Sequence, residues 1–469
     1  MDAPRRGKVS RHAAGAEWLV VVMKSRNGDG AKGPHRPAYL IDQPRKRGRN
    51  LLEEAKSFSI SKRAVWEAFR RVKANRGAAG VDGQSIEEFE ADLKDNLYKL
   101  WNRMSSGSYF PPPVQRVEIP KKGEGNKTRP LGIPTVSDRV AQMVCKMYLE
   151  PKVEPHFHAD SYGYRPDKSA LEAVGKARER CWKYAWVLDV DIKDFFDNID
   201  HELLMRAVRK HTDCKWVLLY IERWLVAPVQ MADGSLQNRE KGTPQGSVIS
   251  PLLANLFLHY AVDKWMERMC PSIPFERYAD DVICHCRTEE QVQWLRTRLE
   301  QRLAECGLQL HPAKTRIVYC KKDGRPGKHP HERFDFLGFT FRPRRAQARK
   351  SRRFFVGFLP AASNEAAKSM RHTIRTWRLQ YRTRQTVEQL AQLINPVTRG
   401  WVHYYGAYYR SALGLIFDYL DRRLARWARR KYKRLRCSQR RAREWLQGIR
   451  RRHPELFAHW HLHRSMAGR

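Results

Sequence analysis

Residues 275–284 read FERYADDVIC, with apolar residues on both sides of an acidic centre. This pattern predicts a β-hairpin whose turn lies near Asp280 and Asp281. An acidic pair in a loop is usually just solvated, so this stretch alone does not predict a site. Its meaning depends on a second acidic stretch nearer the N-terminus.

Residues 186–192 read WVLDVDI and alternate as a β-strand does, which places Val187, Asp189 and Asp191 on one face. Carboxylates embedded in apolar sequence are unfavourable unless a counter-charge is near. Such oxygen ligands suit Mg²⁺, which binds through one or two carboxylates plus substrate phosphates. Two such ions about 4 Å apart stabilise the attacking and leaving oxygens of phosphoryl transfer, as in polymerases. The two stretches together supply candidate ligands for a two-metal site.

The charge of the whole chain points to a polyanionic partner. Its 469 residues include 90 Lys and Arg against 50 Asp and Glu, a net charge of +40. Self-repulsion on this scale is usually relieved by a nucleic acid, and a solvated basic surface without a partner is the alternative. The nine cysteines contain no C-x-x-C pair, which argues against a disulfide scaffold or a zinc ribbon. No apolar run approaches the ~20 residues of a membrane span. These features predict a reducing cytoplasm and no membrane partner.

The pattern along the chain predicts a mixed middle and a helical end. Residues 1–50 are basic, lack an apolar period and are expected to be a disordered extension. Ser85 with Glu88 forms a capping-box pattern that predicts a helix start. Residues 130–340 mix strands and helices without a βαβ repeat, which indicates an α+β domain. Beyond Phe341, Arg-rich segments are interleaved with aromatic residues, a composition that suits RNA.

Several motifs resemble those of one polymerase family. Residues 278–281 (YADD) resemble the Y-x-D-D box of reverse transcriptases. Residues 191–196 (DIKDFF) resemble the strand that carries their third carboxylate, and residues 243–247 (TPQGS) resemble their P-Q-G loop. The remaining motifs are similar, in the same order, to those of the bacterial group II intron reverse transcriptase/maturases: residues 129–134 (RPLGIP), 138–142 (DRVAQ), 162–166 (YGYRP), 307–310 (GLQL) with 314–315 (KT), 336–339 (FLGF) and 400–405 (GWVHYY).

The resemblance covers about residues 51–425 and implies an α+β right-hand polymerase followed by an all-α thumb. Residues 51–345 are expected to form the fingers and a palm with an antiparallel sheet. Residues 346–425 are expected to form the thumb or maturase (X) domain. Residues 426–469 are expected to be a basic, DNA-binding-like tail, and they contain no H-N-H or Cys-pair endonuclease signature.

The resemblance also implies the roles of the acidic residues. Asp191, Asp280 and Asp281 are expected to be the catalytic ligands of two Mg²⁺ ions, with Mn²⁺ as a possible substitute, and the backbone of Ile192 is expected to join them. Asp281 is the less firm of the three because it can mainly contact the primer end. Asp189 shares their strand face and is expected to support them.

Five further residues are expected to bind the nucleotide or its neighbours: Lys121, Arg129, Phe196, Gln245 and Lys314. The first two flank a Gly-rich loop that can close over a triphosphate, and generic phosphate contacts are the alternative. In the family, the position of Phe196 holds the aromatic residue that excludes a ribose 2′-OH, while a core aromatic is the alternative. The amide of Gln245 can project from its turn toward the nucleotide.

In the C-terminal region, we expect RNA to be bound by exposed basic residues and two tyrosines, while most other aromatics pack a core. The expected RNA-binding residues are Arg371, Arg375, Arg378, Arg382, Arg399, Tyr404 and Tyr405.

The functional prediction is an RNA-directed DNA polymerase that also binds its group II intron RNA and assists splicing and mobility by target-primed reverse transcription. Its expected partners are the intron RNA, a DNA target and primer, and dNTPs. A splicing factor with a dead polymerase is disfavoured by the intact carboxylates and Gln245. A domesticated reverse transcriptase in host defence or repair stays open, although the segment at 400–405 favours the intron. The sequence predicts no oligomeric state.

Overall fold

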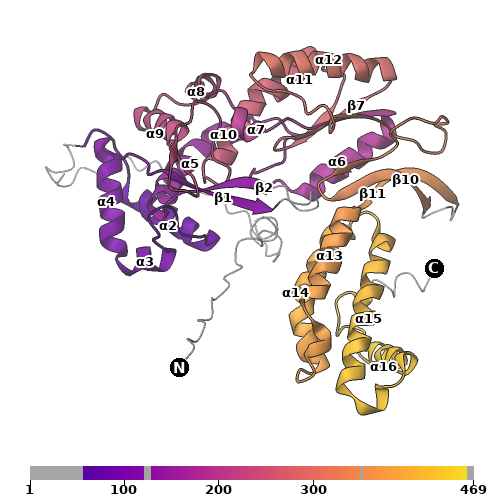
Figure 1. Ribbon diagram of the computed structural model, residues 1–469. Helices are drawn as coiled ribbons and strands as arrows, with labels where there is room; N and C mark the ends of the chain where they lie inside the picture. The colour runs from indigo at the N-terminus through magenta and orange to yellow at the C-terminus, as the bar shows by residue number, and fades with distance from the viewer. Residues whose placement is uncertain (1–55, 121–127, 349–350, 352, 462–469) are drawn as a thin grey trace, which may run out of the picture. The chain divides into compact units, whose positions relative to one another are not determined.

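The computed structural model describes residues 56–120, 128–348, 351 and 353–461, which divide into two compact units (Figure 1). The first unit comprises the chain up to Lys152 together with Val208–Ser250, and the second comprises Val153–Ala207 together with Pro251 onward. Lys121 and the extension at 1–50 lie outside the described residues.

The first unit contains helices and one four-stranded sheet. The capping box predicted at Ser85 is confirmed, because its hydroxyl accepts from the Glu88 backbone N–H and the Glu88 carboxylate accepts from the Ser85 N–H. The sheet has the order β2-β1-β4-β5, with β1 antiparallel to β2 and parallel to β4. The elements are α2 (Lys62–Asn75), α3 (Ile86–Ala91), α4 (Leu93–Ser106), β1 (Val114–Pro120), β2 (Thr128–Ile133), α5 (Val136–Val153), α9 (Lys215–Val226), β4 (Val229–Gln230) and β5 (Leu236–Gln237).

The second unit is built on an antiparallel central sheet with the order β6-β7-β3-β8. Its middle strand, β3, pairs Leu188 with Cys284 on one side and with Ile317 on the other. Leu188 and Cys284 are fully buried, as expected for apolar residues of an inner strand pair. The strands are β3 (Trp186–Val190), β6 (Phe275–Tyr278), β7 (Asp281–Cys286) and β8 (Arg316–Tyr319).

Helices cover the central sheet, and α12 packs against β3 and β7 (Figure 1). Between α10 and α11 the chain forms one π-helical segment, His259–Asp263, of a kind that often marks a functional site. The helices of this layer are α6 (Ala170–Lys183), α7 (Phe195–Asn198), α8 (His201–Arg209), α10 (Ser250–Leu258), α11 (Lys264–Met269) and α12 (Glu289–Glu305).

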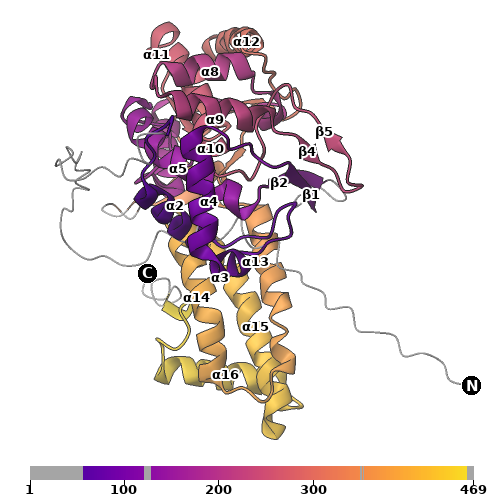
Figure 2. The same ribbon diagram turned by 90° about the vertical axis from the view of Figure 1, so that its left-hand side faces the viewer.

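A three-stranded sheet and a helical bundle complete the second unit. In the bundle, α13, α14 and α15 run side by side and α16 packs against α15 (Figures 1 and 2). Its core includes Trp427, Phe457 and Trp460, each 2% exposed or less. The elements are β9 (Phe334–Phe336), β10 (Phe339–Gln347), β11 (Phe354–Ala362), α13 (Asn364–Thr376), α14 (Val387–Tyr405), α15 (Gly414–Lys431) and α16 (Gln439–Arg452).

The structure corrects both C-terminal domain boundaries. The boundary expected after residue 345 falls inside β10, and the one expected after residue 425 falls inside α15. Residues 426–461 are therefore part of the bundle rather than a separate tail. His459 and Trp460 both hydrogen-bond one Oδ1 of Asp421, at 2.9 and 3.1 Å, which ties this end of the chain to α15. Basic composition hid this packing because only every third or fourth residue of an amphipathic helix faces the core.

All nine cysteines lie in the described part of the chain and are free thiols. Seven are buried, Cys214 is half-buried and Cys437 is exposed. The expected burial of Cys284 and Cys286 is confirmed. Among the described residues, no helix is both long enough and apolar enough to cross a bilayer.

Candidate active site and nucleotide-contact residues

The predicted acidic hairpin is confirmed as β6 and β7, joined by a two-residue turn. Tyr278 pairs with Asp281 across the strands, so Ala279 and Asp280 form the turn itself. Ala279 has φ 56°, in the left-handed region that residues with a Cβ seldom adopt. Such strain persists only where the surroundings hold it, and it often occurs at functional sites. The turn is therefore held by its neighbours rather than by its own preference.

Asp191 follows directly after β3, where a loop of distant sequence fixes its backbone. Its carbonyl oxygen accepts from the His311 N–H at 2.8 Å and from the Thr315 hydroxyl at 3.3 Å. Ile192 forms an isolated antiparallel bridge with Leu310. These contacts explain why the GLQL and KT motifs occur together with the acidic strand, since they hold its C-terminal end.

The carboxylates repel one another. Burial of the carboxylate first, and then the charges of Asp280 and Asp191, raise the pKa of Asp281 to about 7. Because Asp281 is solvent-exposed, the neighbouring carboxylates contribute more to this shift in pKa than burial does. Burial, followed by the charge of Asp281, raises the pKa of Asp189 to about 8. The Lys314 ammonium lies 3.5 Å from Asp191 Oδ2 and partly balances this charge.

This crowding is the feature that fits divalent cations. Among the described residues, no three His, Cys, Asp or Glu side chains already gather closely enough to hold a metal ion by themselves. Mg²⁺ at phosphoryl-transfer sites takes its remaining ligands from substrate phosphates and water, so a pre-closed cage is not required. When bound, two such ions would stabilise the attacking and leaving oxygens of the displacement.

A fully buried arginine holds the acidic turn through a hydrogen bond to its backbone. Arg277 donates to Asp263 Oδ1 at 2.7 Å and to Asp263 Oδ2 at 2.6 Å, and both side chains are 0% exposed. The same guanidinium donates to Asn255 Oδ1 at 2.9 Å and to the Ala279 carbonyl at 3.0 Å. Bidentate geometry is the strongest form of such a pair. Arg277 therefore links the π-helical segment to the strained residue of the turn.

The YGYRP motif lies along the same turn. The Tyr162 N–H donates to the Arg277 carbonyl at 2.8 Å, and the Gly163 carbonyl accepts from the Asn255 amide at 2.6 Å. A Cβ at Gly163 would lie 2.3 Å from the Ala279 backbone nitrogen. Only glycine permits this approach of two backbones.

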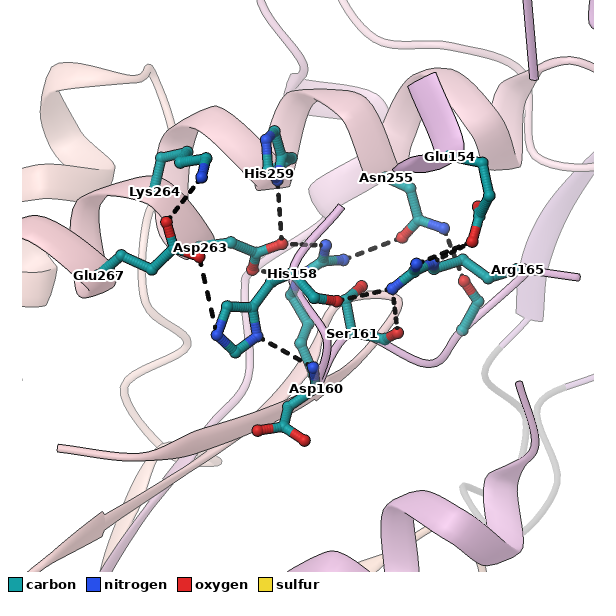
Figure 3. A network of polar contacts seen from close by, with 12 residues as sticks. Glu154, His158, Asp160, Ser161, Arg165, Asn255, His259, Asp263, Lys264 and Glu267 are labelled. Atoms are coloured by element: carbon teal, nitrogen blue, oxygen red, sulfur yellow. Dashed lines mark hydrogen bonds and ion pairs between the residues drawn. The ribbon is translucent and has the colours of Figure 1, made fainter. Parts of the chain in front are cut away.

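A second ionic network flanks the first (Figure 3). Arg165 contacts Glu154 at 2.7 Å and donates to the carbonyls of His158 and Ser161, which closes the loop before α6. His158 lies 3.8 Å from Glu267 on α11. The loop that carries Gly163 is thereby fastened at both ends.

Two predicted nucleotide contacts meet in the first unit. Arg129 Nε donates to the side-chain oxygen of Gln245, 116 residues away along the chain. The P-Q-G loop lies against β2, because the Gly132 N–H donates to the Gln245 carbonyl at 2.6 Å. Gly246 has φ 109° and lies close to the Gly132 carbonyl, so it admits no side chain. The structure thus brings Arg129 and Gln245 together.

The sequence did not predict the residues beneath that loop. Gln142 Oε1 accepts from the backbone N–H groups of Val248 and Ile249, at 2.8 and 3.3 Å. Its amide donates to the buried Asp138. Burial raises the pKa of Asp138 to about 6, although hydrogen bonds from Tyr109, Trp224 and Gln142 favour the charged form. The DRVAQ motif therefore orients the P-Q-G loop. The polar pair Asp138 and Gln142, spaced i, i+4 on a helix, was the sequence feature that could have indicated this role.

Phe196 is 6% exposed and packs edge-on against Phe195 with ring centroids 5.3 Å apart. Its role in sugar selection remains a prediction.

The residues expected to bind RNA fall into two groups. Arg375, Arg378 and Arg399 are exposed, and Arg371 and Arg382 are half-exposed. Tyr404 and Tyr405 instead pack against Phe339 of β10, with centroid distances of 5.2 and 5.5 Å. The Tyr404 hydroxyl donates to the Leu337 carbonyl at 2.9 Å, and burial raises its pKa. These two half-buried rings contact the protein's own FLGF turn, and their role in RNA binding stays a prediction.

Comparison with known proteins places this geometry in a family. The model of the family "Reverse transcriptase (RNA-dependent DNA polymerase)" matches residues 119–341, and the model "Group II intron, maturase-specific domain" matches residues 367–446. The chain belongs to the group II intron reverse transcriptase/maturases. These proteins are RNA-directed DNA polymerases. The predicted α+β fold with a C-terminal helical bundle is confirmed by the sheets and helices of this chain.

Two curated relatives are similar to parts of this chain. Protein YkfC of Escherichia coli K12 is 31% identical over 318 residues, covering 58% of this chain and 78% of that protein. The group II intron-encoded protein LtrA of Lactococcus lactis is 34% identical over 224 residues, covering 46% of this chain and 35% of LtrA. The chain thus spans about a third of LtrA's length. A telomerase structure from Candida albicans, 12% identical, covers 78% of this chain and 65% of that one with a TM-score of 0.43.

Proposed function

We propose that this group II intron reverse transcriptase copies RNA into DNA with Asp191, Asp280 and Asp281 as ligands of two Mg²⁺ ions. The carbonyl of Ile192 would join them, and Mn²⁺ would substitute for Mg²⁺. The observation that carries the proposal is the pairing of Val190 with Val282, which brings the end of β3 at Asp191 beside Asp281 of the acidic turn. The charges of Asp191 and Asp280 help burial to raise the pKa of Asp281, and a divalent cation would relieve this crowding.

In the same proposal, Arg129 and Gln245 bind the incoming dNTP as a paired donor and acceptor. Lys121 assists them, and Phe196 excludes ribonucleotides. Lys314 exchanges its contact with Asp191 for one with substrate phosphate, as a mobile point charge can.

We further propose that the chain binds its own intron RNA, assists its splicing and mediates its mobility by target-primed reverse transcription. The partners are the intron RNA, a DNA target and primer, and dNTPs, in the bacterial cytoplasm. The match of residues 367–446 to the maturase-specific domain supports this step. The exposed arginines of the bundle, Arg375, Arg378 and Arg399, are the proposed RNA contacts.

The double variant Asp280→Ala with Asp281→Ala tests both parts. It removes two metal ligands and also two charges that crowd each other, so the fold should survive. We expect cDNA synthesis to fall by orders of magnitude, while stimulation of intron splicing at low Mg²⁺ persists.

The matched control, Glu300→Ala with Glu305→Ala, removes two exposed charges from α12 and should behave as wild type. Retained cDNA synthesis in the Asp double variant would refute the catalytic assignment. Loss of splicing help in a folded variant would refute a maturase role separate from the metal site.

A further inference from the structure

A pocket of about 990 Å³ opens beside β8, one of the two edge strands of the central sheet. Four segments far apart in sequence line it: the start of β3, the helix α12, residues 312–317 with the start of β8, and the loop 328–333 with part of β10.

The lining carries unbalanced positive charge. Its five cations are exposed, and none has a side-chain hydrogen bond or ion pair to another described residue: Arg296, Arg316, Lys328, Arg333 and Arg342. The lining holds two acidic residues. Of these, Glu332 is already engaged by Lys321 at 3.2 Å and by the His329 backbone N–H at 3.3 Å. The pocket therefore favours a ligand with several negative charges.

The walls of the pocket are rigid and partly aromatic. Pro312, Pro330 and Pro343 stand in two of its four segments, and proline lowers the freedom that a loop loses on binding. The His329 ring packs against both Trp186 and Tyr319, with centroid distances of 4.6 and 4.2 Å. A preformed wall of this kind binds with little ordering of the protein.

The pocket also adjoins the catalytic strand. Thr315 lies in its wall, and the same hydroxyl contacts the Asp191 carbonyl. Lys314, the neighbouring residue, lies 3.5 Å from the Asp191 carboxylate. A ligand held in this pocket would contact Thr315, whose hydroxyl bonds the backbone of Asp191, a proposed metal ligand.

We propose that this pocket binds the phosphodiester backbone of a single-stranded nucleic acid. The five cations line a pocket of about 990 Å³, at the upper end of the range for small-molecule sites, so its room suits several units of a strand better than one free nucleotide. The inference rests on the proposed function only in that the chain works on nucleic acid. RNA and DNA strands offer the same backbone charge, and separate titrations distinguish them.

The test compares two double variants with the same change in charge. Arg333→Ala with Arg342→Ala removes two lining cations. Arg206→Ala with Arg268→Ala removes two exposed arginines on other helices that likewise lack a partner among the described side chains. Binding of a 12-nucleotide single strand, as RNA and as DNA, is measured by fluorescence anisotropy across a KCl series. Thermal unfolding confirms that all proteins are folded.

Each phosphate contact on a single strand contributes roughly 0.7 to the slope of log K against log salt. We expect the pocket variant to lose about 1.4 from this slope and the control to lose none. Equal slopes in both variants, with wild-type primer extension intact, would overturn the pocket and leave the proposed function standing. Displacement of the strand by an equimolar amount of dATP would also overturn it. A wild-type chain that binds neither strand would overturn both.

Discussion

Asp263→Asn should loosen the acidic turn from a distance. The substitution keeps the shape of the side chain but removes the charge that faces Arg277 in a fully buried pair. Breaking one side of such a pair generally destabilises a protein by about 3–5 kcal/mol, because an uncompensated charge stays buried. The acidic turn should be destabilised before other parts of the fold, because Arg277 also donates a hydrogen bond to the Ala279 carbonyl.

The pKa of Asp263 gives a second route to the magnitude. Burial alone would raise it, but Arg277 first and then His259 outweigh burial and lower the pKa from 3.8 to about 2. A difference of about two units corresponds to roughly 2.5 kcal/mol in favour of the ionised form. Because the folded pKa lies below the unfolded one, this stability is present above pH 4 and is lost as pH falls from about 4 toward 2. The Asp263→Asn variant should not show this loss of stability between about pH 4 and pH 2.

Hydrogen–deuterium exchange of peptides from residues 275–286 measures the opening directly. About 2.5–3 kcal/mol corresponds to roughly a hundredfold faster exchange. The control is Glu444→Gln, which breaks the exposed Arg440–Glu444 pair and should leave both exchange and unfolding unchanged. Wild-type exchange at residues 275–286 in Asp263→Asn would refute the reasoning that this pair holds the turn.

Three further substitutions give distinct outcomes. Gly163→Ala should abolish most primer extension in a folded protein, because its Cβ would meet the backbone of the turn, whereas Gly448→Ala in open space on α16 should not; equal activity of the two would contradict the close approach. Phe196→Ala should raise ribonucleotide incorporation in single-nucleotide extension, and unchanged sugar discrimination would make the residue a core aromatic only. Trp460→Ala should destabilise the bundle by about 3–5 kcal/mol in calorimetry, and an unchanged bundle transition would show that the end of the chain is not part of its core.

The parts of the site that the sequence predicted are those set by local periodicity. Alternation along residues 186–192 predicted β3 and the shared face of its carboxylates, and the polar centre of residues 275–284 predicted the hairpin. Both follow from the two-residue period of a strand, which needs no tertiary information. The pairing of Arg129 with Gln245 had only the family resemblance as a guide.

The missed features depend on contacts between distant segments. Asp263 and Asn255 look like ordinary polar residues of a long apolar helix, and only the fold brings them to Arg277. Tyr404 and Tyr405 lie among arginines in the sequence, and only the fold shows that their rings also pack on the turn before β10. In residues 439–452, the high arginine content made the apolar stripe of the helix difficult to recognise from the sequence.

The distribution of thiols offers a practical handle on this bundle. Cys437 is exposed just before α16, whereas the other eight cysteines are buried or half-buried. Burial also raises the pKa of several of them, including Cys145 and Cys284, so they react slowly with alkylating reagents. A maleimide dye under brief treatment should therefore attach at one place without any engineered substitution. The fluorescence anisotropy of the attached dye would rise when a long RNA binds and slows the tumbling of the protein. This measurement needs no change to the native sequence.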